Sequence, residues 1–314
     1  MKLAFIVDPL DEFKLEKDTT YAIMREAAAQ GHALYVMQQG DLAWHRNVVT
    51  GNAARLHLTG EKPDWYRLDP PEETPLERFD AVLMRKDPPF DMEYVYSTYL
   101  LEIAEGRGAR VFNRPQAIRD HNEKMAIARF SEFTAPTLVT RRTELLHAFL
   151  GEHADIILKP LDGMGGSSIF RVRAGDPNLN VIIETLTAEG ARTIMAQRYL
   201  PEIVNGDKRV LVIGGEAVPY CLARIPKAGE TRGNLAAGGT GVARELTTRD
   251  RLIAETLGPQ LQSAGLLLVG LDVIGDHLTE VNVTSPTCFQ EITDQTGFNV
   301  AAMFLNKLEK MLLP

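Results

Sequence analysis

Cysteine is scarce in this chain: only Cys221 and Cys288 occur among 314 residues, and they do not form a C-x-x-C pair. A disulfide framework or a cysteine-based zinc site is therefore not expected, and a reducing cytoplasm fits this usage.

Long apolar runs are also missing. The run at residues 3–7 ends at Asp8 and Pro9, so it is too short for a signal-peptide core and predicts a buried strand. With no run long enough to cross a bilayer, we expect a cytoplasmic protein without a membrane partner.

An excess of positive charge is lacking as well. The chain carries 34 Lys and Arg against 42 Asp and Glu, which gives a net charge of -8 and a pI of about 5.5. Nucleic acid is therefore not an expected partner, because general nucleic-acid binding needs a basic surface. Local clusters of Arg and Lys can still bind a small anionic substrate. The length favours two or three domains.

The first third of the chain alternates between expected strands and helices. Helices are expected at residues 17–30, with Asp18 or Thr19 as the cap, and at about residues 91–106. Strands are expected at residues 3–7, 34–37, 81–86 and 110–113. This order is typical of an open α/β sheet, so we assign residues 1–121 to an N-terminal domain with an open parallel sheet.

The pattern changes after His121. Helices are expected at residues 122–133 and 143–153, and they alternate with strands at residues 136–140, 155–160, 168–173 and 193–200. We predict a small central domain at residues 122–200 that is built on a hairpin. In residues 201–314, two hairpins turn at residues 214–215 and 275–276, and helices are expected at about 248–264 and 299–312. A glycine-rich stretch at residues 226–241 is predicted to be a mobile loop.

A strand that ends in Lys159 leads into a glycine turn with the sequence DGMGGSS at residues 162–168. Glycine lets backbone N–H groups turn toward an anion, so Gly165, Gly166 and Ser167 are candidate phosphate contacts. This is neither a Walker motif nor a dinucleotide fingerprint, which requires a following helix. An ordinary hairpin loop beside a surface lysine explains the same residues about equally well.

Carboxylates and an amide gather on the last predicted hairpin. Alternation places Glu280 and Asn282 on one face of a strand, and Asp272 can lie opposite them on the paired strand. These oxygen ligands suit Mg²⁺ that bridges phosphates. The alternative is the polar face of an exposed hairpin, but the intervening residues are apolar, so we expect this face to line a cleft.

Two further basic residues are weaker signals when each is taken alone. Lys124 starts a helix after a loop, where a solvated helix face is the favoured explanation. Arg209 opens a strand, and a guanidinium there can bind a phosphate or a tetrahedral oxyanion.

The loop at residues 226–241 is better explained as a closing lid than as a linker, because a linker should not interrupt one compact lobe.

The order of these residues resembles the ATP-grasp superfamily, from Lys124 through Lys159 to Arg209 and the carboxylates of the last hairpin. Nearly the whole chain is similar to the bacterial glutathione synthetases. The segments that carry this resemblance are RKDPPFDMEY (85–94), NRPQAIRDHNEK (113–124), LKPLDGMGGSSIFR (158–171), IPKAGETRGNLAAGG (225–239) and TEVNVTSPTCFQEI (279–292).

The resemblance implies an α/β ATP-grasp fold, in which residues 122–200 are a lid and residues 201–314 are the catalytic domain. The implied ATP contacts are Lys124, Lys159, Gly165, Gly166, Ser167, Gln197, Tyr199, Leu200, Asp207, Arg209 and Asn282. The implied metal ligands are Asp272, Glu280 and Asn282. The implied substrate contacts are Arg85, Arg224, Asn282, Ser285, Thr287 and Glu291. Arg209 and Lys159 are the expected catalytic residues.

The same resemblance implies a ligase that uses ATP and Mg²⁺, which Mn²⁺ can replace, to join γ-glutamylcysteine to glycine through an acyl phosphate. It also implies a homo-oligomer, often a tetramer. Two alternatives remain open at this point. Another ATP-grasp ligase, such as a D-alanine–D-alanine ligase or an amino-acid ligase, would share the nucleotide half. A nucleotide-binding regulatory protein would be expected to lose a metal ligand or the mobile loop.

Overall fold

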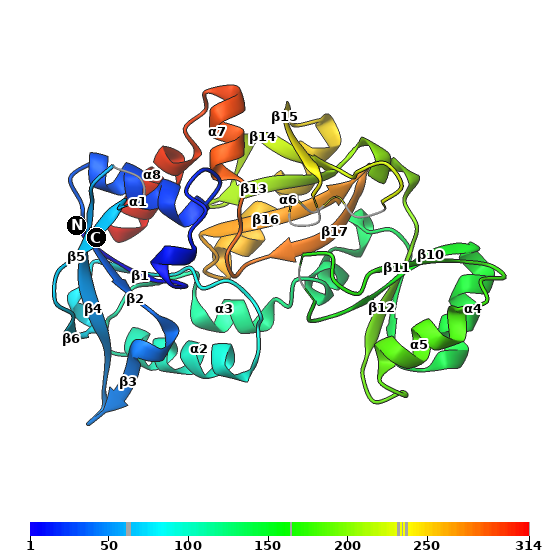
Figure 1. The fold of residues 1–314 in the computed structure, drawn as a ribbon, viewed down its shortest axis with the longest axis horizontal. Coiled ribbons are helices and arrows are strands. Elements are labelled where there is room, and N and C mark those ends of the chain that lie inside the picture. The colour runs from blue at the N-terminus through cyan, green and yellow to red at the C-terminus, as the bar shows by residue number, and fades with distance from the viewer. Residues whose placement is uncertain (61–63, 164, 231–232, 234, 236–237, 314) are drawn as a thin grey trace.

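The computed structural model describes all residues except 61–63, 164, 231–232, 234, 236–237 and 314. Three β-sheets follow one another along the chain, and helices pack on each of them (Figure 1). The first sheet lies at one end of the elongated molecule, the second at the other end, and the third between them. Among the described residues, no helix combines the length and the apolar character needed to cross a bilayer.

The first sheet has a parallel core in the order β2-β1-β7-β8. These strands are β1 (Lys2–Ile6), β2 (Ala33–Met37), β7 (Ala81–Met84) and β8 (Val111–Phe112). Side chains of β1 alternate between two hydrophobic clusters, with Ala4 and Ile6 on one face and Leu3 and Phe5 on the other. Burial on both faces is what a parallel sheet requires. The four predicted strands are confirmed to within a few residues.

The same sheet continues into antiparallel strands that were not predicted, and β4 pairs with β2 at the junction. They are β3 (Leu42–His45), β4 (Val48–Leu58), β5 (Tyr66–Leu68) and β6 (Glu72–Pro75). Both β5 and β6 pair with β4. They are short, and β6 contains Glu and Pro, which are depleted in strands, so their pattern gives little signal.

Two long helices of this region begin as predicted. Asp18 accepts the N–H of Tyr21 at the start of α1 (Thr19–Ala29), and Asp91 accepts that of Tyr94 in α2 (Met92–Glu105). The inner side chains of α2 join the core on one face of the sheet. The short α3 (Pro115–Asp120) starts with proline, a favoured first helical residue.

The second sheet is antiparallel, in the order β11-β10-β12-β9. Its strands are β9 (Thr137–Thr140), β10 (Asp155–Pro160), β11 (Phe170–Arg173) and β12 (Ile194–Arg198). The helices α4 (Thr143–His153) and α5 (Leu179–Thr187) share one hydrophobic cluster with β10. Helix α5 was not predicted, whereas α4 and the four strands were.

The predicted α-helix at residues 122–133 is wrong. The structure has a 3₁₀ helix at Met125–Phe133, interrupted at Phe130 by a non-helical φ of -130° and ψ of 44°. The Asn122 side-chain oxygen accepts the N–H groups of both Lys124 and Met125. These are the bonds of a helix cap, so Asn122 marks the start of the segment, and the break at Phe130 divides it.

The third sheet is antiparallel in the order β15-β14-β13-β16-β17. Its strands are β13 (Asp207–Ile213), β14 (Glu216–Ile225), β15 (Thr240–Glu245), β16 (Leu268–Ile274) and β17 (His277–Asn282). Both predicted hairpins are confirmed. Gly214, Gly215 and Gly275 have positive φ at their turns, a backbone conformation that glycine adopts without strain. Strand β15 was not predicted.

Three helices accompany this sheet. Helix α6 (Thr248–Ser263) begins with a capping box of Thr247 and Asp250. It and α8 (Val300–Leu312) match the two predicted helices, whereas α7 (Phe289–Thr296) was not predicted.

The predicted mobile loop at residues 226–241 connects β14 to β15. Residues 231–232, 234 and 236–237 lie outside the described residues, and residues 240–241 already belong to β15. The role of this loop as a lid stays a prediction.

Contacts between the first and third sheets are extensive. Helix α8 packs on α1, and both chain ends lie close together (Figure 1). Asn113, directly after β8, accepts the N–H groups of Leu267 and Leu268 and donates to the carbonyls of Leu268 and Val283. These four bonds of 2.7–3.0 Å hold β8 against β16 and the end of β17.

Candidate active site

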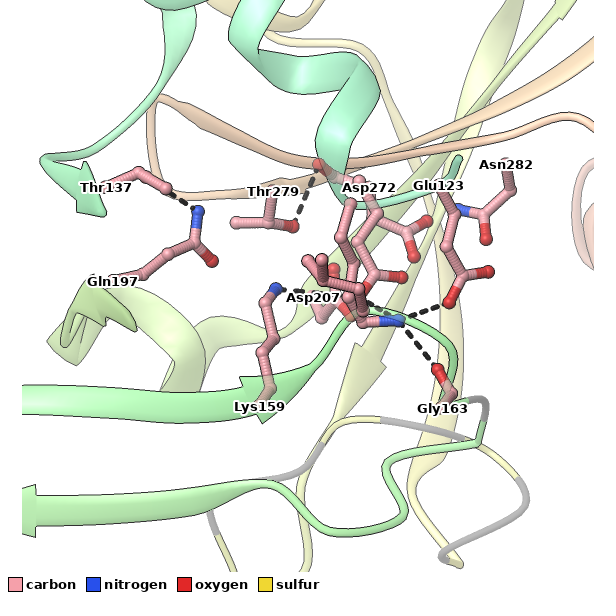
Figure 2. Close-up of polar contacts among 12 residues, drawn as sticks. Glu123, Thr137, Lys159, Gly163, Gln197, Asp207, Asp272, Thr279 and Asn282 are labelled. Carbon is pink, nitrogen blue, oxygen red and sulfur yellow. Dashed lines mark hydrogen bonds and ion pairs between the residues drawn. The ribbon is translucent and has the colours of Figure 1, made fainter. Parts of the chain in front are cut away.

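A cavity of about 320 Å³ lies between the second and third sheets. Strands β10 and β12 line one side, and β13, β16 and β17 line the other. In Figure 2, Lys159 on β10 extends toward the acidic side chains of the third sheet. The predicted residues that meet around this cavity are Lys124, Lys159, Gly165, Gly166, Gln197, Tyr199, Leu200, Asp207, Arg209, Arg224, Asp272, Glu280, Asn282, Ser285 and Thr287.

One part of the cavity wall is apolar. Ile157 and Ile274 contribute to it, and each lies two residues from a charged cavity residue on the same strand, Lys159 and Asp272. Residues two apart in a strand share a face, so an apolar and a charged side chain enter the cavity side by side. This arrangement suits a molecule with a flat apolar ring and an anionic tail.

The strand end beside this apolar wall is held rigidly. The guanidinium of Arg171 lies 3.4 Å from the ring centroid of Tyr199, a cation–π contact. Asp155 holds that guanidinium with two hydrogen bonds of 2.9 and 2.6 Å and accepts the Tyr199 N–H on its backbone oxygen. The side chain of Gln197 donates to Thr137 at 3.1 Å (Figure 2). Residues 197–200 therefore form a fixed edge of the cavity.

Two buried lysines share one carboxylate. Lys124 Nζ lies 3.7 Å and Lys159 Nζ lies 3.6 Å from Oε1 of Glu280. Burial lowers the pKa of Lys159, although Glu280 opposes the change. Burial acts on Lys124 in the same sense, but Glu280 and Glu123 outweigh it and the pKa of Lys124 is raised. Lys124 also contacts Glu123 and donates to the carbonyl of Gly163 in the glycine turn.

Two arginines are anchored beside these lysines. Arg209 binds Asp272 through two hydrogen bonds of 2.6 and 3.1 Å. Arg224 contacts Asp207 at 2.5 Å and Asp272 at 2.9 Å. Burial opposes the charge of Asp272, but the two arginines outweigh it and hold its pKa at about 2. Burial raises the pKa of Asp207 to about 7 against the effect of Arg224. Asp272 is therefore the firmly charged partner of both guanidiniums.

The oxygen atoms needed for a divalent cation are present on β16 and β17. Asp272 and Glu280 are direct cross-strand partners, and Asn282 lies two residues further on the same face. The Asn282 amide nitrogen donates to the carbonyl of Gly270 at 3.2 Å, so its oxygen is the atom offered as a ligand. In the part of the chain that the structure describes, no three His, Cys, Asp or Glu side chains are assembled for a metal. Two carboxylates and an amide fit Mg²⁺, which commonly takes one or two carboxylates plus phosphate oxygens.

Three predicted residues lie outside the cavity lining: Arg85, Ser167 and Glu291. The buried guanidinium of Arg85 donates to Thr20 Oγ1 at 3.1 Å and to the carbonyl of Pro286 at 2.9 Å. It therefore fixes the segment that carries Ser285 and Thr287, which do line the cavity. In this structure Arg85 supports the predicted substrate segment and does not itself enter the cavity.

The cavity also contains residues that the sequence analysis did not select. Glu123 lies half-buried beside Lys124, and its pKa is raised by partial burial and then by Glu280. Alternation applied backward from Lys159 and forward from Asp272 could have found Ile157 and Ile274, which lie two residues away on the same strands. Cys288 also lines the cavity, with a thiol whose pKa is raised by burial. The backbone of Cys288 has a φ of 90°, and the sequence pattern does not predict this conformation.

The chain is of the ATP-grasp ligase class: residues 123–297 match an ATP-grasp family model, and solved ATP-grasp ligases share its fold. The complex of the ATP-grasp ligase PsnB with a minimal precursor, Mg and ADP matches this chain with a TM-score of 0.63 at 18% identity. That match covers 99% of this chain and 98% of the other. D-cycloserine synthetase DcsG matches with a TM-score of 0.66 at 15% identity, over 100% of both chains.

Sequence comparison then gives the family. Residues 1–119 match the family model of the prokaryotic glutathione synthetase N-terminal domain, and residues 123–297 match that of its ATP-grasp domain. The glutathione synthetase of Ralstonia nicotianae is 65% identical over 310 residues, which cover 99% of this chain and 96% of that protein. The glutathione synthetase of Nitrosomonas europaea is 63% identical over 314 residues, 99% of this chain and 98% of that protein. The chain belongs to the prokaryotic glutathione synthetase family. This membership does not favour the two alternatives, another ATP-grasp ligase or a nucleotide-binding regulatory protein.

Proposed function

We propose that this chain joins the cysteine carboxylate of γ-glutamylcysteine to the amine of glycine, while ATP is cleaved to ADP and phosphate. The observation that carries the proposal is the convergence of two lysines, two arginines and three oxygen ligands in one cavity of a glutathione synthetase family member. A carboxylate is a poor acyl donor, so it must be activated before an amine can displace an oxygen from it.

In the first step, the carboxylate oxygen attacks the γ-phosphorus of ATP and ADP leaves, which gives an acyl phosphate. Lys124 and Lys159 are proposed to hold the phosphates in line for this attack, because both ammoniums are buried and fixed. The apolar wall formed by Ile157 and Ile274 is proposed to receive the adenine, with the backbone of residues 197–200 at its edge. Gly165, Gly166 and Ser167 are proposed to contact the phosphates, and Asp207 the ribose side.

In the second step, the glycine amine attacks the carbonyl carbon, a tetrahedral oxyanion forms, and phosphate leaves with the carboxylate oxygen that it received. Arg209 is proposed to stabilise this oxyanion. Its two bonds to Asp272 fix the guanidinium before the reaction, which is the condition for such stabilisation. Arg224, Ser285 and Thr287 are proposed to bind the peptide and amine substrates, and Arg85 to hold their segment.

Asp272, Glu280 and Asn282 are proposed to hold Mg²⁺, with Mn²⁺ as a substitute. Such an ion would spread the negative charge of the β- and γ-phosphate oxygens. The triphosphate competes with Glu280 for Lys124 and Lys159, so nucleotide binding would release Glu280 from both lysines. Before the nucleotide binds, Glu280 thus acts as the counter-ion that favours the charged form of both lysines.

We also propose the domain division at residues 1–121, 122–200 and 201–314. Each part contains one of the three sheets, which supports it. A cytoplasmic location is proposed from the two cysteines, both free and buried.

An ADP-release assay with γ-glutamylcysteine and different amines tests the proposed substrates. Glycine should stimulate ADP release, whereas D-alanine and glutamate should not. Equal stimulation by D-alanine, or release that needs no γ-glutamylcysteine, would reject this choice of substrates.

A further inference from the structure

The ammonium of Lys124 has three acceptors around it. The carbonyl oxygen of Gly163 accepts a hydrogen bond at 2.6 Å, Oε1 of Glu280 lies 3.7 Å away, and the carboxylate of Glu123 is in direct contact (Figure 2). An ammonium has three N–H donors, so each of these groups can hold one of them. Glu280 is the most distant of the three acceptors, and it also pairs with Lys159.

These partners have different fates under the proposed function. Glu280 turns to Mg²⁺ and the triphosphate, so its contacts to both lysines are given up. Lys124 then still has the carboxylate of Glu123 and the neutral carbonyl of Gly163 beside it. Lys159 differs from Lys124, because its ion pair is with Glu280 itself. Glu123 is therefore the charged partner that stays with Lys124 when the nucleotide binds.

The backbone of Glu123 is fixed independently of its carboxylate. Its carbonyl accepts the N–H of Val281 at 2.8 Å, and Val281 directly follows Glu280 on β17. On the other side, the amide of Asn122 donates to the carbonyl of Leu161 at 3.1 Å, directly before the glycine turn. This short segment thus joins β17 to the glycine turn, and the Glu123 side chain starts from a fixed point.

Two carboxylates beside one ammonium also repel each other. Burial raises the pKa of Glu123 and the charge of Glu280 raises it further, while Lys124 lowers it. When a divalent cation takes up the charge of Glu280, this repulsion falls and the pair of Glu123 with Lys124 becomes stronger. Glu123 thus holds Lys124 most firmly in the nucleotide-bound state, which is the state that reacts.

We infer that Glu123 is a positioning residue, which holds the Lys124 ammonium at the glycine turn when the nucleotide draws Glu280 away. The inference rests on the proposed function, in which Lys124 holds the phosphates in line for transfer. In-line transfer depends on groups that keep their positions. Without the carboxylate of Glu123, the ammonium is free to follow Glu280 or to move among the phosphate oxygens.

A double-mutant cycle tests whether Glu123 acts through Lys124. Glu123→Gln removes the charge and keeps nearly the same shape. It should lower kcat for glycine-dependent ADP release roughly ten- to a hundredfold when Lys124 is present. In the Lys124→Met background it should change the residual rate less than about twofold, because the group that it positions is gone. Equal factors in both backgrounds would overturn the inference.

Nucleotide binding separates positioning from general support of the site. Calorimetry with the Mg²⁺ complex of a non-hydrolysable ATP analogue should give Glu123→Gln an unchanged or higher affinity, because a negative charge beside the triphosphate is removed. A loss of affinity as large as the loss of kcat would mean that Glu123 supports binding in general. That result, or a raised requirement for Mg²⁺, would overturn the inference.

The exposed Glu132 in the following 3₁₀ helix provides the matched control, and Glu132→Gln should behave as the wild type in every assay. If Glu123→Gln does not fold, Glu123→Asp replaces it. This variant keeps the charge and shortens its reach, so its loss of kcat should again require Lys124, and an equal loss in both backgrounds would reject the inference. A wild type without glycine-dependent ADP release would overturn the proposed function and this inference with it, whereas equal factors in both backgrounds overturn the inference alone.

Discussion

At the scale of single residues, Glu280 connects the two charged sides of the cavity. Its Oε1 atom lies 3.6 Å from Lys159 and 3.7 Å from Lys124, which come from different segments of the chain. The carboxylate supports the charge of both lysines against the cost of burial. We therefore expect Glu280 to have two functions: a metal ligand when nucleotide is bound, and a counter-ion when it is absent.

Glu280→Gln should reduce the ATP turnover that depends on a divalent cation by roughly a hundredfold or more, because a charged ligand is lost near the transferring phosphate. The fold should persist, since glutamine has nearly the same shape. Titration of Mg²⁺ against initial rates measures the effect. Glu255→Gln on the exposed side of α6 is the matched control and should behave as the wild type. Full activity in Glu280→Gln would reject the metal assignment.

The same variant makes a prediction about pH. Burial lowers the pKa of Lys159, and Glu280 is the largest effect that raises it. Without that carboxylate the pKa of Lys159 should fall further, so the ammonium loses its proton at a lower pH. The alkaline limb of the residual pH–rate profile should therefore move to lower pH. An unmoved or upward-shifted limb would contradict the contact between these two residues.

Short-range rules predicted part of the cavity lining, and the family resemblance implied most of the other residues. Alternation in β17 places Glu280 and Asn282 on one face, and the structure pairs Asp272 with Glu280 directly. Alternation alone does not show which cations neutralise which carboxylates. The bonds from Arg209 and Arg224 to Asp272 depend on the order and register of β14, β13 and β16 within the third sheet. The structural position of Arg85 depends on how the N-terminal region meets the segment after β17.

At the scale of elements, Asn113 links the first and third sheets. All four of its side-chain bonds reach backbone groups that lie more than 150 positions further along the chain. The Asn113 amide, directly after β8, thus satisfies backbone groups beside the start of β16 and directly after the end of β17. Because β16 and β17 carry Asp272 and Glu280, this contact also positions one wall of the cavity relative to the N-terminal sheet.

Asn113→Ala should lower the free energy of unfolding by about 2–4 kcal/mol, because buried backbone N–H and C=O groups lose their partners. Urea denaturation followed by fluorescence or circular dichroism measures the change. The exposed Asn306 in α8 provides the control, since Asn306→Ala should change stability by less than about 0.5 kcal/mol. An equal effect of both substitutions would show that the four side-chain bonds of Asn113 do not contribute to stability.

The elements themselves were predicted where a cap or a periodic pattern marks them. Helices α1 and α2 have Asp caps and apolar periodicity, and both glycine-turn hairpins were found. The antiparallel strands β5 and β6 are three and four residues long, which is too short for a pattern. The α-helix expected at residues 122–133 is instead a 3₁₀ segment, which Phe130 interrupts by leaving helical geometry.

At the scale of the whole molecule, the cavity exists because two antiparallel sheets face each other. The second sheet supplies Lys159 and Ile157, and the third supplies Ile274, the carboxylates and the arginines. The first sheet contributes Asp87 and Pro88 to the lining, close to the start of α2.

The central claim is that ATP activates the carboxylate of γ-glutamylcysteine before glycine attacks. The most direct measurement uses γ-glutamylcysteine labelled with ¹⁸O in both oxygens of its cysteine carboxylate, together with ATP, Mg²⁺ and glycine. The account predicts that one ¹⁸O appears in the released phosphate and one remains in the new amide, as read by mass spectrometry. Amide product formed with unlabelled phosphate would contradict the account, because no acyl phosphate would then have been on the path.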